Sequence, residues 1–185
     1  MIQQLISYID LYHGKIDSST VKIDNDVLKF SILESFHKNE FYNEHYKDYL
    51  FYGSTEYDKL YPYIDDAFKA VNFKNKNKIR TLIENNRFAN VYLPNEKSLS
   101  RCNLDKNDLI NSPDYTLVYA VDVVDNSSKL MINYDDNKRK GMRWEFPIMN
   151  NYFFIFPSNQ EYYITENNSK NLNVYLTINY NYYQY

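Results

Sequence analysis

Histidine, cysteine and carboxylate side chains are the groups with which this sequence could hold a metal or activate a substrate. The chain has three histidines, His13, His37 and His45, all near its beginning. His37 and His45 are eight residues apart, which is not the i, i+4 spacing that places two histidines on one helical turn. The single cysteine, Cys102, excludes an internal disulfide and a cysteine-based zinc site. No local motif of these residue types therefore predicts a metal site.

The composition excludes several classes of protein but names no function. The chain carries 21 positive and 24 negative side chains, a net charge of −3, which argues against a protein that binds nucleic acid through a general basic field. An aromatic content of 18% excludes a disordered chain, and three glycines exclude glycine-rich phosphate loops. The 21 tyrosines fit the codon usage of an AT-rich genome, so they indicate little about chemistry.

The beginning of the chain has no pattern of an export signal. It lacks a basic n-region, and Tyr8, Asp10 and His13 interrupt its apolar stretch, so we expect no secretory signal peptide. No uncharged apolar run reaches the roughly 18 residues of a membrane span. A lone cysteine fits a reducing compartment. We therefore expect a protein of the cytoplasm or of a virion, without membrane contact.

The elements that must position any site differ between the two parts of the chain. Because no Pro- or Gly-rich linker separates these parts, we expect a single domain over residues 1–185, mixed helical and strand-forming over 1–78 and a jelly-roll β part over 79–185. In the last predicted strand, apolar residues alternate from Val174 to Ile178 and face a core. The predicted β runs are Phe88–Leu93, Ser98–Asp105, Tyr115–Val123, Lys129–Tyr134, Arg143–Pro147, Tyr152–Phe156, Glu161–Thr165 and Leu172–Tyr182. The fold class is thus mainly β with an N-terminal helical part.

The first part of the chain is harder to interpret. A short strand is expected at residues 27–30, and residues 36–53 favour a helix in spite of irregular apolar spacing. A clearer helix follows, with a capping box at Thr55 and Asp58. Pro62 lacks the backbone donor and clashes with the preceding turn, so we expect two short helices or a start near this residue.

The most specific pattern is the segment Asn150–Ser158, which ends in Phe-Pro-Ser and is followed by Tyr162 and the strand Val174–Asn179. The earlier strands that belong to the same pattern are Val118–Val121 and Lys129–Asp136. Together they resemble the 2-oxoglutarate/Fe(II) dioxygenase superfamily, in particular the small prolyl-hydroxylase-like members carried by bacteriophages. The resemblance covers roughly residues 79–180 and implies a double-stranded β-helix, a form of jelly roll.

The resemblance also implies a site of two histidines and one carboxylate around Fe(II), and an arginine that binds the carboxylate of 2-oxoglutarate. At the matching positions the chain has Asn103 and Asp105 for the His-x-Asp pair, Tyr162 for the distal histidine and Asn173 near the arginine. Only the carboxylate is kept, and no arginine follows Arg143. We therefore expect a degenerate pocket at Asn103, Asp105, Tyr162 and Asn173, with no catalytic residue and no metal ligand.

Three functions remain open at this point. The first is a non-catalytic module with the oxygenase-like fold, a structural or protein-binding component of a bacteriophage that uses no cofactor. The second is an active dioxygenase with unusual ligands, recruiting His37 or His45, and only here are Fe(II) and 2-oxoglutarate expected. The third is a carbohydrate-binding jelly roll, in which tyrosines stack on sugars and asparagines bind hydroxyls. We favour the first, so a pseudoenzyme is expected rather than an enzyme.

The C-terminal end is the candidate interface. Its tyrosines are Tyr180, Tyr182, Tyr183 and Tyr185. An exposed aromatic patch of this kind usually marks an interface, so we expect this end to pair in a sheet or to pack against a partner subunit. The expected partners are proteins or further copies of the chain, not nucleic acid or membrane.

Overall fold

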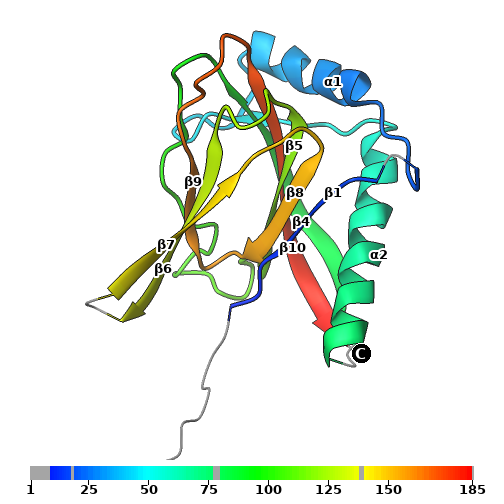
Figure 1. Cartoon of the computed structure of the whole chain (residues 1–185), viewed down its shortest axis with the longest axis vertical. Coiled ribbons are helices and arrows are strands. Elements are labelled where there is room, and N and C mark those ends of the chain that lie inside the picture. Colours follow the sequence, from blue (N-terminus) through cyan, green and yellow to red (C-terminus); the bar gives the residue numbers. More distant parts are fainter. Residues whose placement is uncertain (1–8, 18, 77–79, 138–139, 185) are drawn as a thin grey trace, which may run out of the picture.

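A computed structural model describes residues 9–17, 19–76, 80–137 and 140–184 (Figure 1). In chain order the elements are β1 (Tyr12–Lys15), α1 (Asn25–His37), β2 (Phe41–Asn43), β3 (Asp48–Leu50), α2 (Tyr57–Lys76), β4 (Arg80–Tyr92), β5 (Tyr115–Asp122), β6 (Lys129–Asn137), β7 (Lys140–Pro147), β8 (Tyr152–Pro157), β9 (Glu161–Ile164) and β10 (Asn173–Gln184). A seven-stranded sheet has the order β1-β8-β5-β10-β4-β3-β2, and a three-stranded sheet has the order β7-β6-β9. All pairs are antiparallel.

The large sheet has a hydrophobic cluster on each of its two faces. On the outer face, Leu28 of α1 and Leu60 and Ile64 of α2 pack against the sheet, which both helices flank (Figure 1). On the inner face, Tyr175 of the large sheet and Leu130 of the small sheet belong to a second cluster, which fills the space between the sheets. The molecule therefore has three layers, and burial on both faces makes the central strands the most enclosed part of the chain.

Strand β10 shows how alternation produces these two clusters. Val174, Leu176 and Ile178 are fully buried on the helix side, as the alternating pattern predicts. The residues that alternate with them are buried as well, because a second sheet covers the other face; of these, Thr177 and Asn179 are 1% and 4% exposed. Polar residues on this strand thus lie inside the molecule and not in solvent.

The predicted fold class is confirmed, and from Tyr115 onward each predicted run coincides with a strand to within a few residues. Two predictions for the first half of the β part differ from the structure. β4 runs without a break from Arg80 to Tyr92, so it joins the predicted run at Phe88 to the strand also expected around Leu82 and Ile83. Ser98–Asp105 forms no strand but only an isolated bridge between Arg101 and Tyr162. The single-domain boundaries stay a prediction.

Two N-terminal predictions were wrong. Residues 27–30 lie within α1, because the side chain of Asp24 caps the helix by accepting the backbone N–H groups of Asp26 and Val27. The predicted helix over 36–53 is instead the end of α1 followed by the β2–β3 hairpin. The apolar spacing of residues 36–53 is irregular because this segment passes from a helix into two short strands. Its aromatic rings pair across the hairpin, with 4.8 Å between the ring centroids of Phe41 and Tyr49.

The helix α2 is continuous and contains Pro62. The predicted capping box at Thr55 is not formed; the hydroxyl of Ser54 accepts the backbone N–H of Tyr57 instead. Because the proline lies near the beginning of the helix, the interruption it causes is confined to the first turns. Neither helix of the described residues combines the length and the hydropathy that a membrane span requires.

The C-terminal end pairs in the large sheet, one of the two outcomes expected for it. Tyr182 is opposite Leu82 of β4 and Tyr183 is opposite Thr81. Tyr180 is fully buried in the helix-side cluster, where its ring stacks on Tyr61, so it is unavailable to a partner. Tyr182 and Tyr183 are 36% and 55% exposed, while the last residue of the chain lies outside the described residues.

Candidate functional site

The inner face of the large sheet carries a band of polar side chains. In an antiparallel sheet, residues directly opposite one another share a face, so the strand register places these side chains together. Asn90 of β4 is opposite both Asp48 of β3 and Tyr175 of β10. In the next polar row, Asn179 of β10 is opposite Thr116 of β5. The pairing of β3, β4, β5 and β10 thus builds one polar band inside the molecule.

A buried ion pair lies at the centre of this band. Nη1 of Arg101 donates to both carboxylate oxygens of Asp48, at 2.6 and 2.8 Å, and the two side chains are 5% and 4% exposed. Nδ2 of Asn90 donates to the same carboxylate at 2.7 Å, and the Asn90 carbonyl accepts the hydroxyl of Thr177 at 3.0 Å. The carboxylate is therefore neutralised and bonded, which is the condition under which a buried charge is tolerated.

The guanidinium of Arg101 joins the two sheets. Its Nε donates to the phenol oxygen of Tyr162 in β9 at 2.8 Å, and its Cζ lies 4.8 Å from the ring centroid of Phe88 in β4. Burial lowers the pKa of Arg101, but its neighbours Tyr162 and Asp48 raise it by more. The pKa therefore lies above its ordinary value, and the guanidinium stays positively charged. Burial also raises the pKa of Tyr162, which keeps this phenol protonated.

Asn103 extends the network to the neighbouring polar row. Its Nδ2 donates to Oγ1 of Thr116 and to Oδ1 of Asn179, both at 2.9 Å, and lies 3.3 Å from the phenol oxygen of Tyr162. Thr116 in turn is 2.9 Å from the hydroxyl of Ser158, the last residue of the Phe-Pro-Ser segment. The amide of Asn103 therefore cross-links β5, β9 and β10 from inside.

Of the four predicted pocket residues, the structure brings together Asn103 and Tyr162 only. Asp105 lies in an exposed turn, where its carboxylate accepts the backbone N–H of Asn107. Asn173 is fully buried, but its amide binds the hydroxyls of Ser127 and Ser128 at 2.8 and 3.0 Å, in the turn between β5 and β6. Asp105, the retained carboxylate, and Asn173, near the position expected for the arginine, thus lie outside the hydrogen-bond network of Asn103 and Tyr162.

The side chains in this band do not fit the Fe(II) site that the resemblance implies. Such a site needs two imidazoles and a free carboxylate on one face of the metal. His13, His37 and His45 are all exposed, and the described residues contain no group of three or more histidine, cysteine or acidic side chains that could hold a metal ion. Asp48, the carboxylate inside the band, is already bound by Arg101.

Two central residues of the band, Asp48 and Arg101, were missed from the sequence. Asp48 lay in a segment that favoured a helix, so its place on an inner sheet row was hidden. Arg101 did carry a signal, since it lies within a run predicted to be a strand and therefore half-buried. A charged residue inside such a run is a candidate for a buried ion pair.

Comparison with known proteins gives a fold but no close relative. No family model and no curated protein matches the chain. Among solved structures, a prolyl hydroxylase from Trichoplax adhaerens, in complex with a peptide of the hypoxia-inducible factor, matches with a TM-score of 0.61 and 13% identity over 93% of this chain and 82% of that one. A prolyl-4-hydroxylase from Pseudomonas putida matches with a TM-score of 0.55 and 11% identity over 92% and 85%. The non-heme alpha-ketoglutarate-dependent epimerase SnoN from nogalamycin biosynthesis matches with a TM-score of 0.61 and 9% identity over 92% and 76%.

These neighbours correct one expectation and confirm another. The expectation that no cofactor is involved is contradicted, because the matched structures include enzymes whose names state that they are non-heme and dependent on alpha-ketoglutarate, the epimerase SnoN among them. The resemblance inferred from the Phe-Pro-Ser segment is confirmed at the level of the fold. The chain has the double-stranded β-helix fold of the 2-oxoglutarate/Fe(II) oxygenases.

Proposed function

We propose that this chain is a binding module built on the oxygenase fold, and that the space between its sheets serves stability rather than oxygenation. The observation that carries the proposal is the ion pair of Asp48 and Arg101, whose guanidinium also donates to Tyr162, the residue that the sequence pattern assigns to the place of the distal histidine. A module of this kind acts through its surface, on a protein partner or on further copies of itself.

The cost of opening the ion pair supports the proposal. A metal bound by Asp48 would displace Arg101, leaving a guanidinium that is buried without a counter-ion. Removing one partner of a buried pair costs about 3–5 kcal/mol, so the carboxylate is committed to the arginine.

A structural role on a bacteriophage particle is the most specific form of this proposal. It is supported by the composition of an AT-rich genome and by the resemblance of the Phe-Pro-Ser segment to phage-borne members of the superfamily. The candidate interface is the exposed end of β10 at Tyr182 and Tyr183. Light scattering coupled to size exclusion, with the full chain and a Tyr182→Ser/Tyr183→Ser variant, measures whether this end joins copies of the chain.

The rival function is an active dioxygenase, which the names of the structural neighbours favour. The experiment that separates the two is 2-oxoglutarate turnover by the full chain, loaded anaerobically with Fe(II) and then exposed to oxygen, with succinate as the readout. We expect succinate at the level of a heat-denatured sample. Turnover above that level, with iron near one atom per chain, would overturn the proposal.

A further inference from the structure

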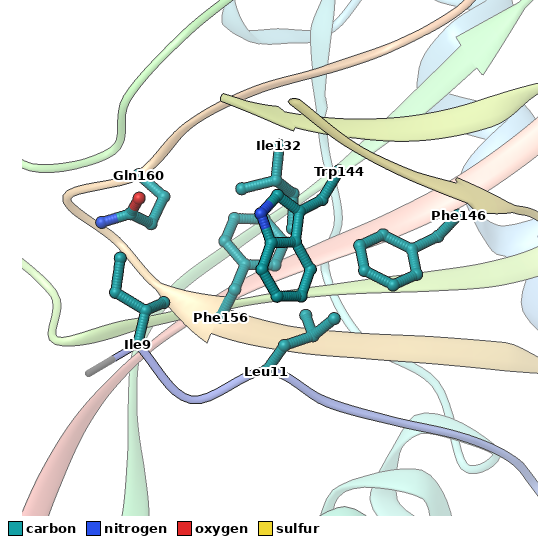
Figure 2. Close-up of a pocket in the computed structure, with 7 residues that line it drawn as sticks. All are labelled: Ile9, Leu11, Ile132, Trp144, Phe146, Phe156 and Gln160. Atoms are coloured by element: carbon teal, nitrogen blue, oxygen red, sulfur yellow. The ribbon is translucent and has the colours of Figure 1, made fainter. Parts of the chain in front are cut away.

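A separate apolar cavity opens beside the polar band, with a volume of about 110 Å³. Its lining residues are Ile9, Leu11, Ile132, Trp144, Phe146, Phe156 and Gln160 (Figure 2). Figure 2 shows Trp144 and Phe146 reaching in from β7, while Ile9 and Leu11 come from the segment that precedes β1. The cavity thus lies between the small sheet, the end of β8 and the N-terminal segment.

Phe156 separates this cavity from the polar band. Its ring contacts the ring of Tyr162 at 4.9 Å between centroids, and it is opposite Thr116 in the large sheet. One side of Phe156 therefore faces the hydrogen-bond network and the other faces the cavity. Because none of the charged groups of the network lines the cavity, the two places have different chemistry.

The lining defines what the cavity can hold. Three aromatic and three aliphatic side chains make its wall, which suits a flat apolar group, because rings pack favourably in offset or edge-on contacts. An engineered cavity of about 150 Å³ binds one benzene molecule; this cavity is smaller, so at most one ring enters it. Trp144 is 47% exposed, so the wall that it forms is open to an entering molecule.

Gln160 supplies the one side-chain amide among the residues that line the cavity, and this amide adds a hydrogen-bonding group to the apolar wall. Gln160 is 9% exposed, and its Nε2 donates to the side-chain carbonyl of Asn159 at 2.8 Å. Among the described residues no donor meets its Oε1, so this oxygen is the acceptor that the wall offers to a bound group. A ring that carries a hydroxyl donor satisfies both the apolar wall and this acceptor.

We propose that this cavity binds a single aromatic ring with a hydroxyl group, that is, a phenol-type small molecule. The site goes beyond the proposed function, because its ligand is a small molecule and not a protein partner or a further copy of the chain. The hydroxyl donates to Oε1 of Gln160, and the ring packs between Trp144 and Phe156.

The test uses phenol as the probe and Trp144 as the reporter. Trp144 is the single tryptophan of the chain, so its indole N–H gives one unambiguous signal in a nitrogen–proton correlation spectrum. Titration of the full chain with phenol should move this signal in a saturable way. Toluene, which has the ring without the donor, should bind on the order of tenfold more weakly, and a Gln160→Met variant should remove this difference.

Two variants control for the site. Ile132→Phe fills the cavity from its wall and should abolish the saturable shift, whereas Ile110→Phe adds the same ring at a residue that is 94% exposed and should leave it unchanged. If Ile132→Phe does not fold, Leu11→Phe fills the cavity from the N-terminal segment. A shift that rises linearly with phenol, or one that persists in the filled variants, would overturn the site.

The result is separable from the test of the proposed function. Phenol binding without succinate formation supports both proposals. Phenol binding together with 2-oxoglutarate turnover would keep the cavity as a site but overturn the non-catalytic role. Absence of both phenol binding and turnover would overturn the proposed ligand site but not the non-catalytic role.

Discussion

At the scale of single residues, the main feature is the ion pair of Asp48 and Arg101, whose two charges neutralise each other away from solvent. The Asp48 carboxylate accepts from both Arg101 and Asn90, and the arginine also donates to Tyr162. Buried ion pairs contribute little to stability as a whole, because desolvation of the two charges offsets their attraction. Loss of one partner is costly, however, because the other charge stays buried without compensation, and this cost gives the ion pair a clear experimental signature.

We predict that Arg101→Met lowers the free energy of unfolding by about 3–5 kcal/mol, since it leaves the Asp48 carboxylate buried without a cation. Urea unfolding followed by circular dichroism measures the change. The matched control is Lys47→Met, at the residue before Asp48, whose ion pair with Glu96 is partly exposed and should contribute less than about 1 kcal/mol.

The double variant Asp48→Leu/Arg101→Met removes both charges and should recover most of the lost stability. Equal effects of Arg101→Met and Lys47→Met, or a double variant as unstable as the single one, would contradict the role given to the ion pair.

At the scale of elements, a single carboxylate ties the two helices together. Glu56, just before α2, accepts the backbone N–H of Asp24 at the N-terminus of α1 at 2.7 Å and is paired with Lys59 at 2.6 Å. The backbone hydrogen bond from Asp24, followed by the Lys59 hydrogen bond, lowers the pKa of Glu56 below its ordinary value of 4.5. The charged form is therefore favoured in the folded state.

The sign of the pH dependence follows from this shift. Because the folded-state pKa is lowered, the contribution of Glu56 is fully present above pH 4.5 and is lost as the pH falls through the folded-state value. We predict that Glu56→Gln shows a smaller drop of its thermal midpoint between about pH 7 and about pH 3 than the wild type. Glu34→Gln, which changes an exposed pair with Lys38 on α1, should keep the wild-type drop; the same drop in Glu56→Gln would contradict this link.

The end of β10 gives a second prediction at this scale. Deletion of residues 181–185 leaves β4 unpaired from Arg80 to Ile83, which exposes a strand edge and removes the Tyr182 ring from the Arg80 guanidinium. We expect a loss of stability of about 2 kcal/mol, the order of one large buried side chain, and larger species in size exclusion. Tyr52→Ser, at a residue that is 70% exposed and lies outside β10, is the control and should behave as the wild type. A deletion that stays monodisperse and equally stable would contradict the prediction.

The secondary-structure elements also differ in how well the sequence predicts them. Regular strands with β-branched and aromatic residues, such as β5 and β10, were located because their patterns are local. The β2–β3 hairpin was missed because its aromatic and charged residues lack a clean period, and its strands are only three residues long. Two residues of the site, Asn103 and Tyr162, were predicted because they lie in segments that match the family pattern. Asp48, by contrast, reaches the band through pairing with β4, which no local pattern reveals.

At the scale of the whole molecule, a fold used by iron enzymes encloses a band of amides, hydroxyls and one ion pair. Two sheets bring side chains of β3, β4, β5, β9 and β10 to one interior, and α1 and α2 cover the opposite face of the large sheet (Figure 1). The arrangement keeps the geometry of the oxygenase fold while its inner polar groups bind one another. A fold of this kind does not by itself carry an activity; the side chains inside it decide what it does.

The proposal of a non-catalytic module rests on the ion pair in which Asp48 and Arg101 hold each other inside the polar band. The most direct measurement is a crystal structure of the full chain soaked anaerobically with Mn(II), as a substitute for Fe(II), together with 2-oxoglutarate, with the metal located by its anomalous scattering. We predict that Nη1 of Arg101 remains within hydrogen-bond distance of both Asp48 oxygens, so that bound manganese takes no ligand from Asp48. A manganese ion coordinated by Asp48, with Arg101 displaced, would contradict the structural role of this ion pair.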